Sequence, residues 1–158
     1  MTVPLGTLTT TGGGIVLEVT EDPAPEDTEL LDVQVAASTT RAADQGEPRA
    51  VAVFARDDAG SVVGGIHGWT WGGCCELVSL WVDEAARGRG LGEALLSTAE
   101  LEAVDRGCGQ VVLLTHELQA PGLYRRRGYE VVGTVEGYPA GSAALWLRKR
   151  LPDPAGAG

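Results

Sequence analysis

The stretch Leu80-Trp81-Val82-Asp83-Glu84-Ala85-Ala86-Arg87-Gly88-Arg89-Gly90-Leu91-Gly92 decides the fold of this chain. An apolar strand pattern breaks there into a glycine-rich turn, and a helical pattern follows. Glycines lack a Cβ, so the unpaired N–H groups of a helix start can close on an anion, with added attraction from the helix dipole. Two arginines add positive charge in an acidic chain. The stretch predicts an anion-binding turn; the plainer alternative is a tight connection with solvated arginines.

The spacing of the glycines excludes two common nucleotide-binding loops. The dinucleotide fingerprint requires Gly-x-Gly-x-x-Gly, and the glycines at 88, 90 and 92 do not follow that order. The phosphate loop of nucleoside triphosphatases requires Gly-Lys-Ser/Thr, which the stretch does not contain. A phosphate-bearing ligand of another kind is therefore expected.

Two motifs together resemble a known superfamily. Arg87-x-x-Gly90-x-Gly92 resembles the acetyl-coenzyme A pyrophosphate loop of the GCN5-related N-acetyltransferase (GNAT) superfamily, often written Gln/Arg-x-x-Gly-x-Gly/Ala. About thirty residues later, Ala120 to Tyr129 resembles its helix that ends in a tyrosine, three variable residues, a glycine and an aromatic. Sequence stretches such as Gly68-Trp69-Thr70-Trp71-Gly72-Gly73 are similar to those of a bacterial subgroup of the superfamily whose acceptor substrate is unassigned. The resemblance covers roughly residues 48 to 151.

The resemblance implies a fold and a cosubstrate. The fold is α/β, with three α/β/α layers around a mixed sheet that splays at its centre. Acetyl-coenzyme A is the implied cosubstrate, and no metal is implied. Its pantetheine arm is expected along Leu80, Trp81 and Val82, and its pyrophosphate over the turn and first helical residues, namely Arg87, Gly88, Arg89, Gly90, Leu91, Gly92 and Glu93.

Acyl transfer to an amine requires a polarised carbonyl, a proton for the leaving thiolate and a base for the amine. The resemblance places the acid at Tyr124. The base stays open: Glu76 shares a strand face with Val82 unless a β-bulge intervenes. His116 and Glu117 follow the next strand at its carboxyl end, and water is a further candidate for carrying the proton.

Aromatic and basic side chains outside the motifs have two interpretations. His67, Trp69 and Trp71 alternate along one strand face and could line an acceptor pocket, with tryptophan rings attracting a cationic amine, or simply pack on the sheet. Arg125, Arg126 and Arg127 could meet the adenosine phosphate of coenzyme A or end a helix in solvent.

Composition sets the class of protein. The 158 residues, 44% of them apolar, suit one domain with a proper core. A net charge of −10 disfavours nucleic acid and favours cationic or neutral substrates.

We find neither a membrane-spanning stretch nor a secretory signal and expect a cytoplasmic protein. We expect frayed tails at 1–14 and 152–158 around a single domain at 15–151. Three cysteines without metal or disulfide spacing are expected to be reduced.

Patterning along the chain predicts the element order β, α, three meander strands, α, β, α, β, β. The strands are expected at 15–19, 50–56, 62–71, 75–82, 110–115, 129–135 and 143–150, and the helices at 25–43, 90–106 and 120–127. On the second helix, one arc is expected to face the sheet while Glu93 and Glu100 lie opposite. The residues of that arc are Leu91, Ala94, Leu95, Thr98 and Leu101.

These observations predict an acetyl-coenzyme A-dependent N-acetyltransferase that acts by direct attack of a primary amine. A small-molecule amine is the favoured acceptor. The alternatives are a protein lysine or N-terminal acetyltransferase, and a non-catalytic acyl-coenzyme A-binding regulatory module. The superfamily's frequent dimers suggest a homodimer. Residues 1–45 match the subgroup poorly, so the acceptor cannot be inferred by analogy.

Overall fold

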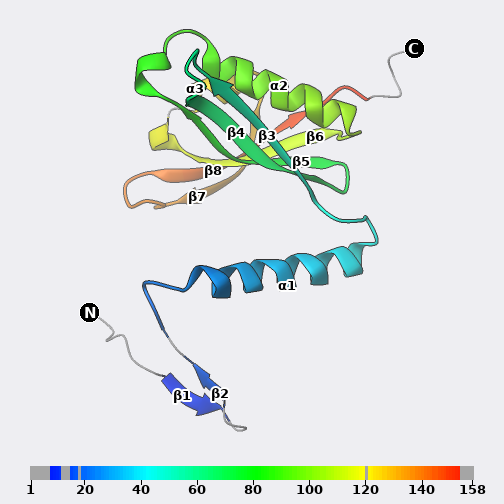
Figure 1. Ribbon diagram of the computed structural model, residues 1–158, viewed down its shortest axis with the longest axis vertical. Coiled ribbons are helices and arrows are strands. Elements are labelled where there is room, and N and C mark those ends of the chain that lie inside the picture. The colour runs from blue at the N-terminus through cyan, green and yellow to red at the C-terminus, as the bar shows by residue number, and fades with distance from the viewer. Residues whose placement is uncertain (1–7, 12–14, 18, 120, 154–158) are drawn as a thin grey trace. The chain divides into compact units, whose positions relative to one another are not determined.

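The computed structural model describes residues 8–11, 15–17, 19–119 and 121–153 (Figure 1). They fall into two compact units, residues 1–43 and 44–158. The first unit contains the strands β1 (Leu8–Thr11) and β2 (Ile15–Leu17), which pair antiparallel, and helix α1 (Pro25–Ala43). Residues 8–11 thus form a strand in the segment expected to be frayed. The rest of that segment, and 154–158 of the expected C-terminal tail, lie outside the described residues.

The second unit is built on a six-stranded mixed sheet in the order β3-β4-β5-β6-β8-β7. Its elements are β3 (Arg49–Arg56), β4 (Val62–Trp71), β5 (Cys74–Val82), η1 (Glu84–Ala86), α2 (Leu91–Asp105), β6 (Gln110–His116), η2 (Glu117–Gln119), α3 (Gly122–Arg126), β7 (Glu130–Glu136) and β8 (Ala143–Arg150). Neighbouring strands are antiparallel except β5 and β6, which are parallel. The order of elements and the mixed sheet confirm the predicted α/β fold class.

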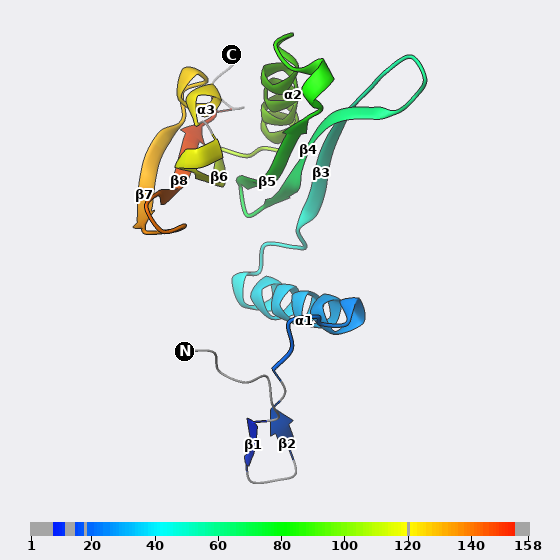
Figure 2. The same cartoon turned by 90° about the vertical axis from the view of Figure 1, so that its left-hand side faces the viewer.

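The sheet divides into two wings between β5 and β6. Their pairing runs from Cys74 opposite Gln110 to Leu77 opposite Leu113 and then stops, although both strands continue. Figure 2 shows the consequence: β3, β4 and β5 form one wing with α2, and β6, β8 and β7 form the other. The central splay expected from the sequence is therefore present in the described sheet.

A β-bulge in β5 lies where the splay begins. His67 of β4 pairs with Ser79, but Gly68 pairs with Leu77, so Val78 is an extra residue. At Gly68 the two backbones approach so closely that an added Cβ would overlap the carbonyl oxygen of Glu76 and lie 2.9 Å from the Cα of Leu77. Only glycine fits at this position.

The face of α2 that packs on the sheet differs from the predicted one. The buried residues are Leu95, Leu96, Ala99, Glu100 and Ala103. Leu101, expected inside, is 65% exposed, and Glu100, expected outside, is 6% exposed. The polarity of Glu100 alone predicts that its side chain faces solvent. In the structure, three donors from distant parts of the chain form hydrogen bonds with its carboxylate, and these bonds allow it to be buried.

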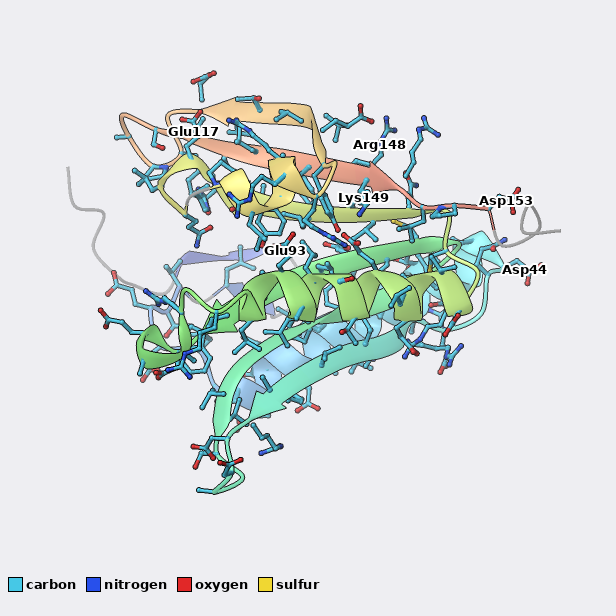
Figure 3. The ribbon with its side chains drawn as sticks, turned by 90° about the horizontal axis from the view of Figure 1, so that it is seen from above. Asp44, Glu93, Glu117, Arg148, Lys149 and Asp153 are labelled. Carbon is cyan, nitrogen blue, oxygen red and sulfur yellow. The ribbon has the colours of Figure 1, made fainter. Side chains whose placement is uncertain are left out.

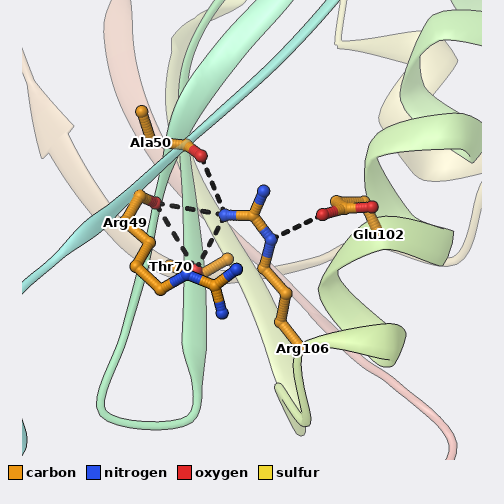
Figure 4. Close-up of polar contacts among 5 residues, drawn as sticks. All are labelled: Arg49, Ala50, Thr70, Glu102 and Arg106. Carbon is orange, nitrogen blue, oxygen red and sulfur yellow. Dashed lines mark hydrogen bonds and ion pairs between the residues drawn. The ribbon is translucent and has the colours of Figure 1, made fainter.

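Arg106 fixes the end of α2 to the start of β3 (Figure 4). Its Nη1 donates to the carbonyl oxygens of Ala50 and Arg49 at 2.8 and 3.3 Å and to the hydroxyl of Thr70 at 3.2 Å. Its Nε donates to Glu102, one turn earlier on the helix, at 2.7 Å. Because one planar guanidinium makes all these bonds, the C-terminal end of α2 is held in a fixed register over its wing.

Candidate active site

The turn between β5 and α2 is organised by local hydrogen bonds. The Asp83 carboxylate caps η1 by accepting from the N–H of Ala85 at 2.9 Å. The Nε of Arg87 donates to the carbonyl oxygen of Val82 at 3.0 Å, which folds that side chain back along the strand end. Gly88 and Gly90 have φ of +74° and +76°, a left-handed conformation that glycine adopts without strain. The turn thus depends on both glycines.

The start of α2 presents free donors. The first helical bond runs from the N–H of Ala94 to the carbonyl oxygen of Gly90 at 3.0 Å. The N–H groups of Leu91, Gly92 and Glu93 precede it and have no acceptor four residues earlier in the helix. Together with the helix dipole they make a seat suited to phosphate oxygens.

A hollow of about 590 Å³ lies against this helix start. It is lined by nine of the ten residues predicted to contact the cofactor, Leu80, Trp81, Val82, Arg87, Gly88, Gly90, Leu91, Gly92 and Glu93, and by Gln119, Leu123 and Arg126. The tenth, Arg89, lines a neighbouring hollow of about 640 Å³ with Asp57, Asp58 and Asp83, and Gly90 and Leu91 line both hollows. The two arginines of the turn therefore line different hollows.

Charges of both signs line the first hollow. Arg87 and Arg126 bring positive charge from two different segments. Glu93 lies at the start of α2, on its side toward β6, apart from Glu117 (Figure 3). Glu93 also lines the hollow, and its negative charge opposes that of a bound phosphate.

A second hollow, of about 520 Å³, opens where β5 and β6 separate. Its lining residues are Val78, Ser79, Leu80, Trp81, Leu114, Thr115, Gln119, Leu123 and Tyr124. Four of them, Leu80, Trp81, Gln119 and Leu123, also line the first hollow, so the two spaces adjoin. Burial raises the pKa of Tyr124 above its ordinary value of 10, which keeps the phenol protonated at neutral pH.

The bulge places Glu76 on the other face of the sheet from Val82. Glu76 pairs with Trp69, and Val82 pairs with Gly64. Residues directly opposite in an antiparallel pair share a face, and Trp69 is exposed while Gly64 is buried against α2. The bulge that would separate Glu76 from Val82 is therefore present, because the extra residue Val78 reverses the alternation and the two side chains do not share a face. Glu76 lines neither hollow.

The other two candidate bases lie away from the hollows as well. The Nδ1 of His116 lies 3.1 Å from the carbonyl oxygen of Tyr138, and the two rings meet edge to face at 4.9 Å. This contact turns the imidazole toward the loop between β7 and β8. Glu117 is exposed in η2. Neither residue lines the space beside Tyr124.

The predicted alternation of His67, Trp69 and Trp71 is present in β4. They lie on the sheet face opposite the buried residues Gly64, Ile66, Gly68 and Thr70. Trp71 is tied by its indole N–H to the carbonyl oxygen of Gly46 at 2.8 Å, a structural contact. Trp69 is 41% exposed beside Glu76. On the same face, Trp81 pairs with Gly65 and reaches both hollows.

Gln119 lines both hollows, and sequence analysis does not identify it as a site residue. Its Oε1 accepts from the backbone N–H of His116 at 3.1 Å and lies 3.4 Å from the hydroxyl of Thr115. Because a backbone N–H can only donate, the amide orientation is set and the Nε2 donors point elsewhere. Gln119 lies three residues past the end of β6, and its residue type and position alone do not indicate a role in the site.

Two kinds of feature are absent from the described residues. No group of three or more His, Cys, Asp or Glu side chains is arranged to hold a metal ion in that part of the chain. Nor does that part contain a helix long and apolar enough to cross a membrane.

Comparison with known proteins gives the family. A model of the acetyltransferase (GNAT) family matches residues 16–129. Blasticidin-S acetyltransferase of Streptomyces morookaense is 38% identical over 104 residues, which span 63% of this chain and 74% of that protein. An acetyltransferase of Agrobacterium fabrum is 34% identical over 107 residues, 68% of this chain and 78% of that one.

A solved structure agrees. The crystal structure of an acetyltransferase from Bacillus cereus superimposes with a TM-score of 0.70 at 27% identity, over 85% of this chain and 98% of that one. The chain belongs to the acetyltransferase (GNAT) family, and it is an N-acetyltransferase by that membership and by its curated relatives.

Proposed function

We propose that the protein transfers an acetyl group from acetyl-coenzyme A to the primary amine of a small molecule. One observation carries the proposal: the two adjoining hollows place a helix start suited to phosphate at one end and a protonated phenol, Tyr124, at the other. The strand β5 runs between these ends and has no β6 partner beyond Leu77. A thioester with a long amide-bearing arm and a pyrophosphate fits that order of groups.

The chain's own residues fit each part of the cosubstrate. The N–H groups of Leu91, Gly92 and Glu93 meet the pyrophosphate, with positive charge from Arg87 and Arg126. The unpaired edge of β5 along Leu80 and Val82 offers backbone groups to the pantetheine amides. A Cβ added at Gly92 would lie 3.6 Å from Leu123 and 3.8 Å from Val82, so a larger residue there would fill the hollow.

Transfer then proceeds by direct attack. The neutral amine forms a C–N bond to the thioester carbonyl carbon, and the C–S bond breaks as the tetrahedral intermediate collapses. Tyr124 donates its phenolic proton to the leaving sulfur, and the amine's excess proton passes to water, from which the phenol is restored. The described residues that line the second hollow include no carboxylate and no imidazole, which leaves water to accept the proton of the amine.

Two observations support a small cationic acceptor. The relative with 38% identity is named for acetylation of blasticidin S. In this chain the bulge brings Glu76, Ser79 and Trp81 onto the same sheet face as His67 and Trp69, which combines a carboxylate with two indole rings. Such a face attracts a cation by charge and by cation–π contact, in keeping with the net charge of −10.

The proposal is tested by coenzyme A thiol release with a panel of blasticidin S, polyamines, aminoglycosides and lysine peptides. We expect release with at least one small amine, the acetylated product in the mass spectrum, and none with peptides. Tyr124→Phe should lower kcat by about 10²-fold, the lower end for loss of a general acid, while the Kd of acetyl-coenzyme A stays the same. Absence of acetyl-coenzyme A binding, or an unchanged kcat in this variant, would refute the proposal or its acid.

A further inference from the structure

Glu100 is a buried carboxylate that accepts hydrogen bonds from three donors in two separate segments, residues 127–129 and strand β8. Its side chain on α2 is 8% exposed. Its Oε1 accepts from the hydroxyl of Tyr129 at 3.1 Å, and its Oε2 accepts from Arg127 Nη2 at 2.9 Å and Lys149 Nζ at 2.8 Å. A carboxylate removed from water is tolerated only when hydrogen bonds and opposite charges replace its hydration. Glu100 has both.

The residues that bind Glu100 also hold Tyr124. The backbone N–H groups of Arg127 and Tyr129 both donate to the carbonyl oxygen of Tyr124, at 3.1 and 3.0 Å. The rings of Tyr124 and Tyr129 meet edge to face, with centroids 5.6 Å apart and planes at 70°. Glu100 therefore fixes the backbone that carries Tyr124 and the ring against which its phenol rests.

Glu100 also connects the two wings of the sheet beside the splay. It belongs to α2, which packs on β3, β4 and β5. Its partners precede β7 or lie in β8, in the other wing. The Nε of Arg127 is buried without a hydrogen-bond partner among the described residues, so this guanidinium is oriented toward Glu100 although one of its own donors is left unsatisfied. That arrangement favours a positional role for the contact.

Resting on the proposed role of Tyr124 as acid, we propose that Glu100 is a positioning residue that sets the place of the Tyr124 phenol relative to the cofactor hollow. A phenol displaced by about 1 Å can lose about 10²-fold in rate. The helix start that is to bind pyrophosphate lies about two turns away along α2, so cofactor affinity does not depend on Glu100. The contact acts on kcat and leaves cofactor binding unchanged.

The experiment is a double-mutant cycle between Glu100→Gln and Tyr124→Phe. Glutamine keeps one acceptor but loses the charge that orients Arg127 and Lys149. We expect Glu100→Gln alone to lower kcat by about 10-fold or more, with the KM of acetyl-coenzyme A within about 3-fold. In the Tyr124→Phe background the same change should have no further effect on kcat, because the phenol through which it acts is absent.

Two further variants guard against misfolding. Tyr129→Phe keeps the ring and removes only the hydroxyl that binds Glu100, and should lower kcat by a smaller factor that also disappears with Tyr124→Phe. Glu102→Gln, which breaks the pair with Arg106 on the same helix, should leave kcat unchanged. An equal loss of kcat in both Tyr124 backgrounds, or a loss confined to melting temperature, overturns the proposal.

The outcomes separate this inference from the proposed function. If Tyr124→Phe leaves kcat unchanged, the acid is misassigned and the positional role falls with it. If Tyr124→Phe lowers kcat and Glu100→Gln does not, only the positional role is wrong. A crystal structure of Glu100→Gln tests the placement without turnover: we expect the Tyr124 ring to leave its edge contact with Tyr129, and an unmoved ring contradicts the proposal.

Discussion

Replacing Gly68 by alanine tests the register on which the whole site depends. The added methyl would overlap the carbonyl oxygen of Glu76 and lie 2.9 Å from the Cα of Leu77, where ordinary contacts begin at 3.4 Å. Both obstacles are backbone atoms of β5 and cannot turn aside as a side chain can. The strands must part beside the bulge, and the separation of β5 from β6 is then set differently.

The cost follows from what parting the strands removes. Loss of two ladder hydrogen bonds at about 1 kcal/mol each, with about 1 kcal/mol for loosened packing around Leu77, gives about 3 kcal/mol. Alanine has a smaller conformational entropy than glycine in the unfolded chain, which offsets about 0.5 kcal/mol of this loss. We therefore expect Gly68→Ala to lower the free energy of unfolding by about 2.5 kcal/mol, a large share of the 5–15 kcal/mol typical of such domains.

Urea unfolding followed by tryptophan fluorescence measures this difference through the midpoint and the slope m. Gly64→Ala is the matched control in the same strand. Its Cβ would meet the Trp81 carbonyl oxygen at 3.2 Å and two leucine methyls at 3.3 and 3.4 Å, which small shifts relieve, so we expect a loss below about 1 kcal/mol. If both variants unfold within about 0.5 kcal/mol of the parent, the close approach and the bulge register are wrong.

Three other predictions concern the turn, the pH and the thiols. Arg87→Gln should raise the Kd of acetyl-coenzyme A, measured by calorimetry, by about 10-fold. Arg89 lines the hollow beside Asp57 and Asp58, so Arg89→Gln should change this Kd by less than about 2-fold. Equal effects of the two variants would contradict the assignment of the arginines to different hollows. Burial and the Glu100 carboxylate raise the pKa of Tyr129, so the native state retains a proton that the unfolded state loses above pH 10, and stability should fall there by up to about 1.4 kcal/mol per pH unit. Tyr129→Phe should flatten that fall in denaturant titrations at pH 9 to 11. Burial raises the pKa of Cys75 to about 12, so at pH 8 an alkylating reagent should label it far more slowly in the native than in the unfolded protein, and equal rates would refute its burial.

Local patterns predicted the parts of this fold that local physics determines. Alternating apolar residues in β3 to β5 and the glycines at 88 and 90 identified the strands, the turn and the start of α2 in the right order. The conformation of the turn depends on residues next to one another in the chain. The turn could therefore be predicted without knowledge of any contact to a distant residue.

The misassigned residues have partners far away in the sequence. Glu100 is buried because of Tyr129 and Lys149, about 30 and 50 residues later, and helical periodicity cannot register a donor on another strand. The bulge at Val78 arises from the pairing of β5 with β4, and it moved Glu76 to the opposite face from the one expected. The His116 ring contacts Tyr138, 22 residues later in the chain, and the spacing of residues around His116 does not predict that contact.

The short seam between β5 and β6, meaning the stretch over which the two strands pair, allows residues far from the hollows to affect catalysis. Only four residue pairs, from Cys74 with Gln110 to Leu77 with Leu113, join the two wings within the described sheet. Cys75 and Val111 in the middle of that seam are fully buried and touch neither hollow. A change of volume at either one alters the angle at which the cofactor side and the Tyr124 side diverge. Variation in activity among relatives can therefore originate at such positions, where a comparison of pocket-lining residues would find nothing altered.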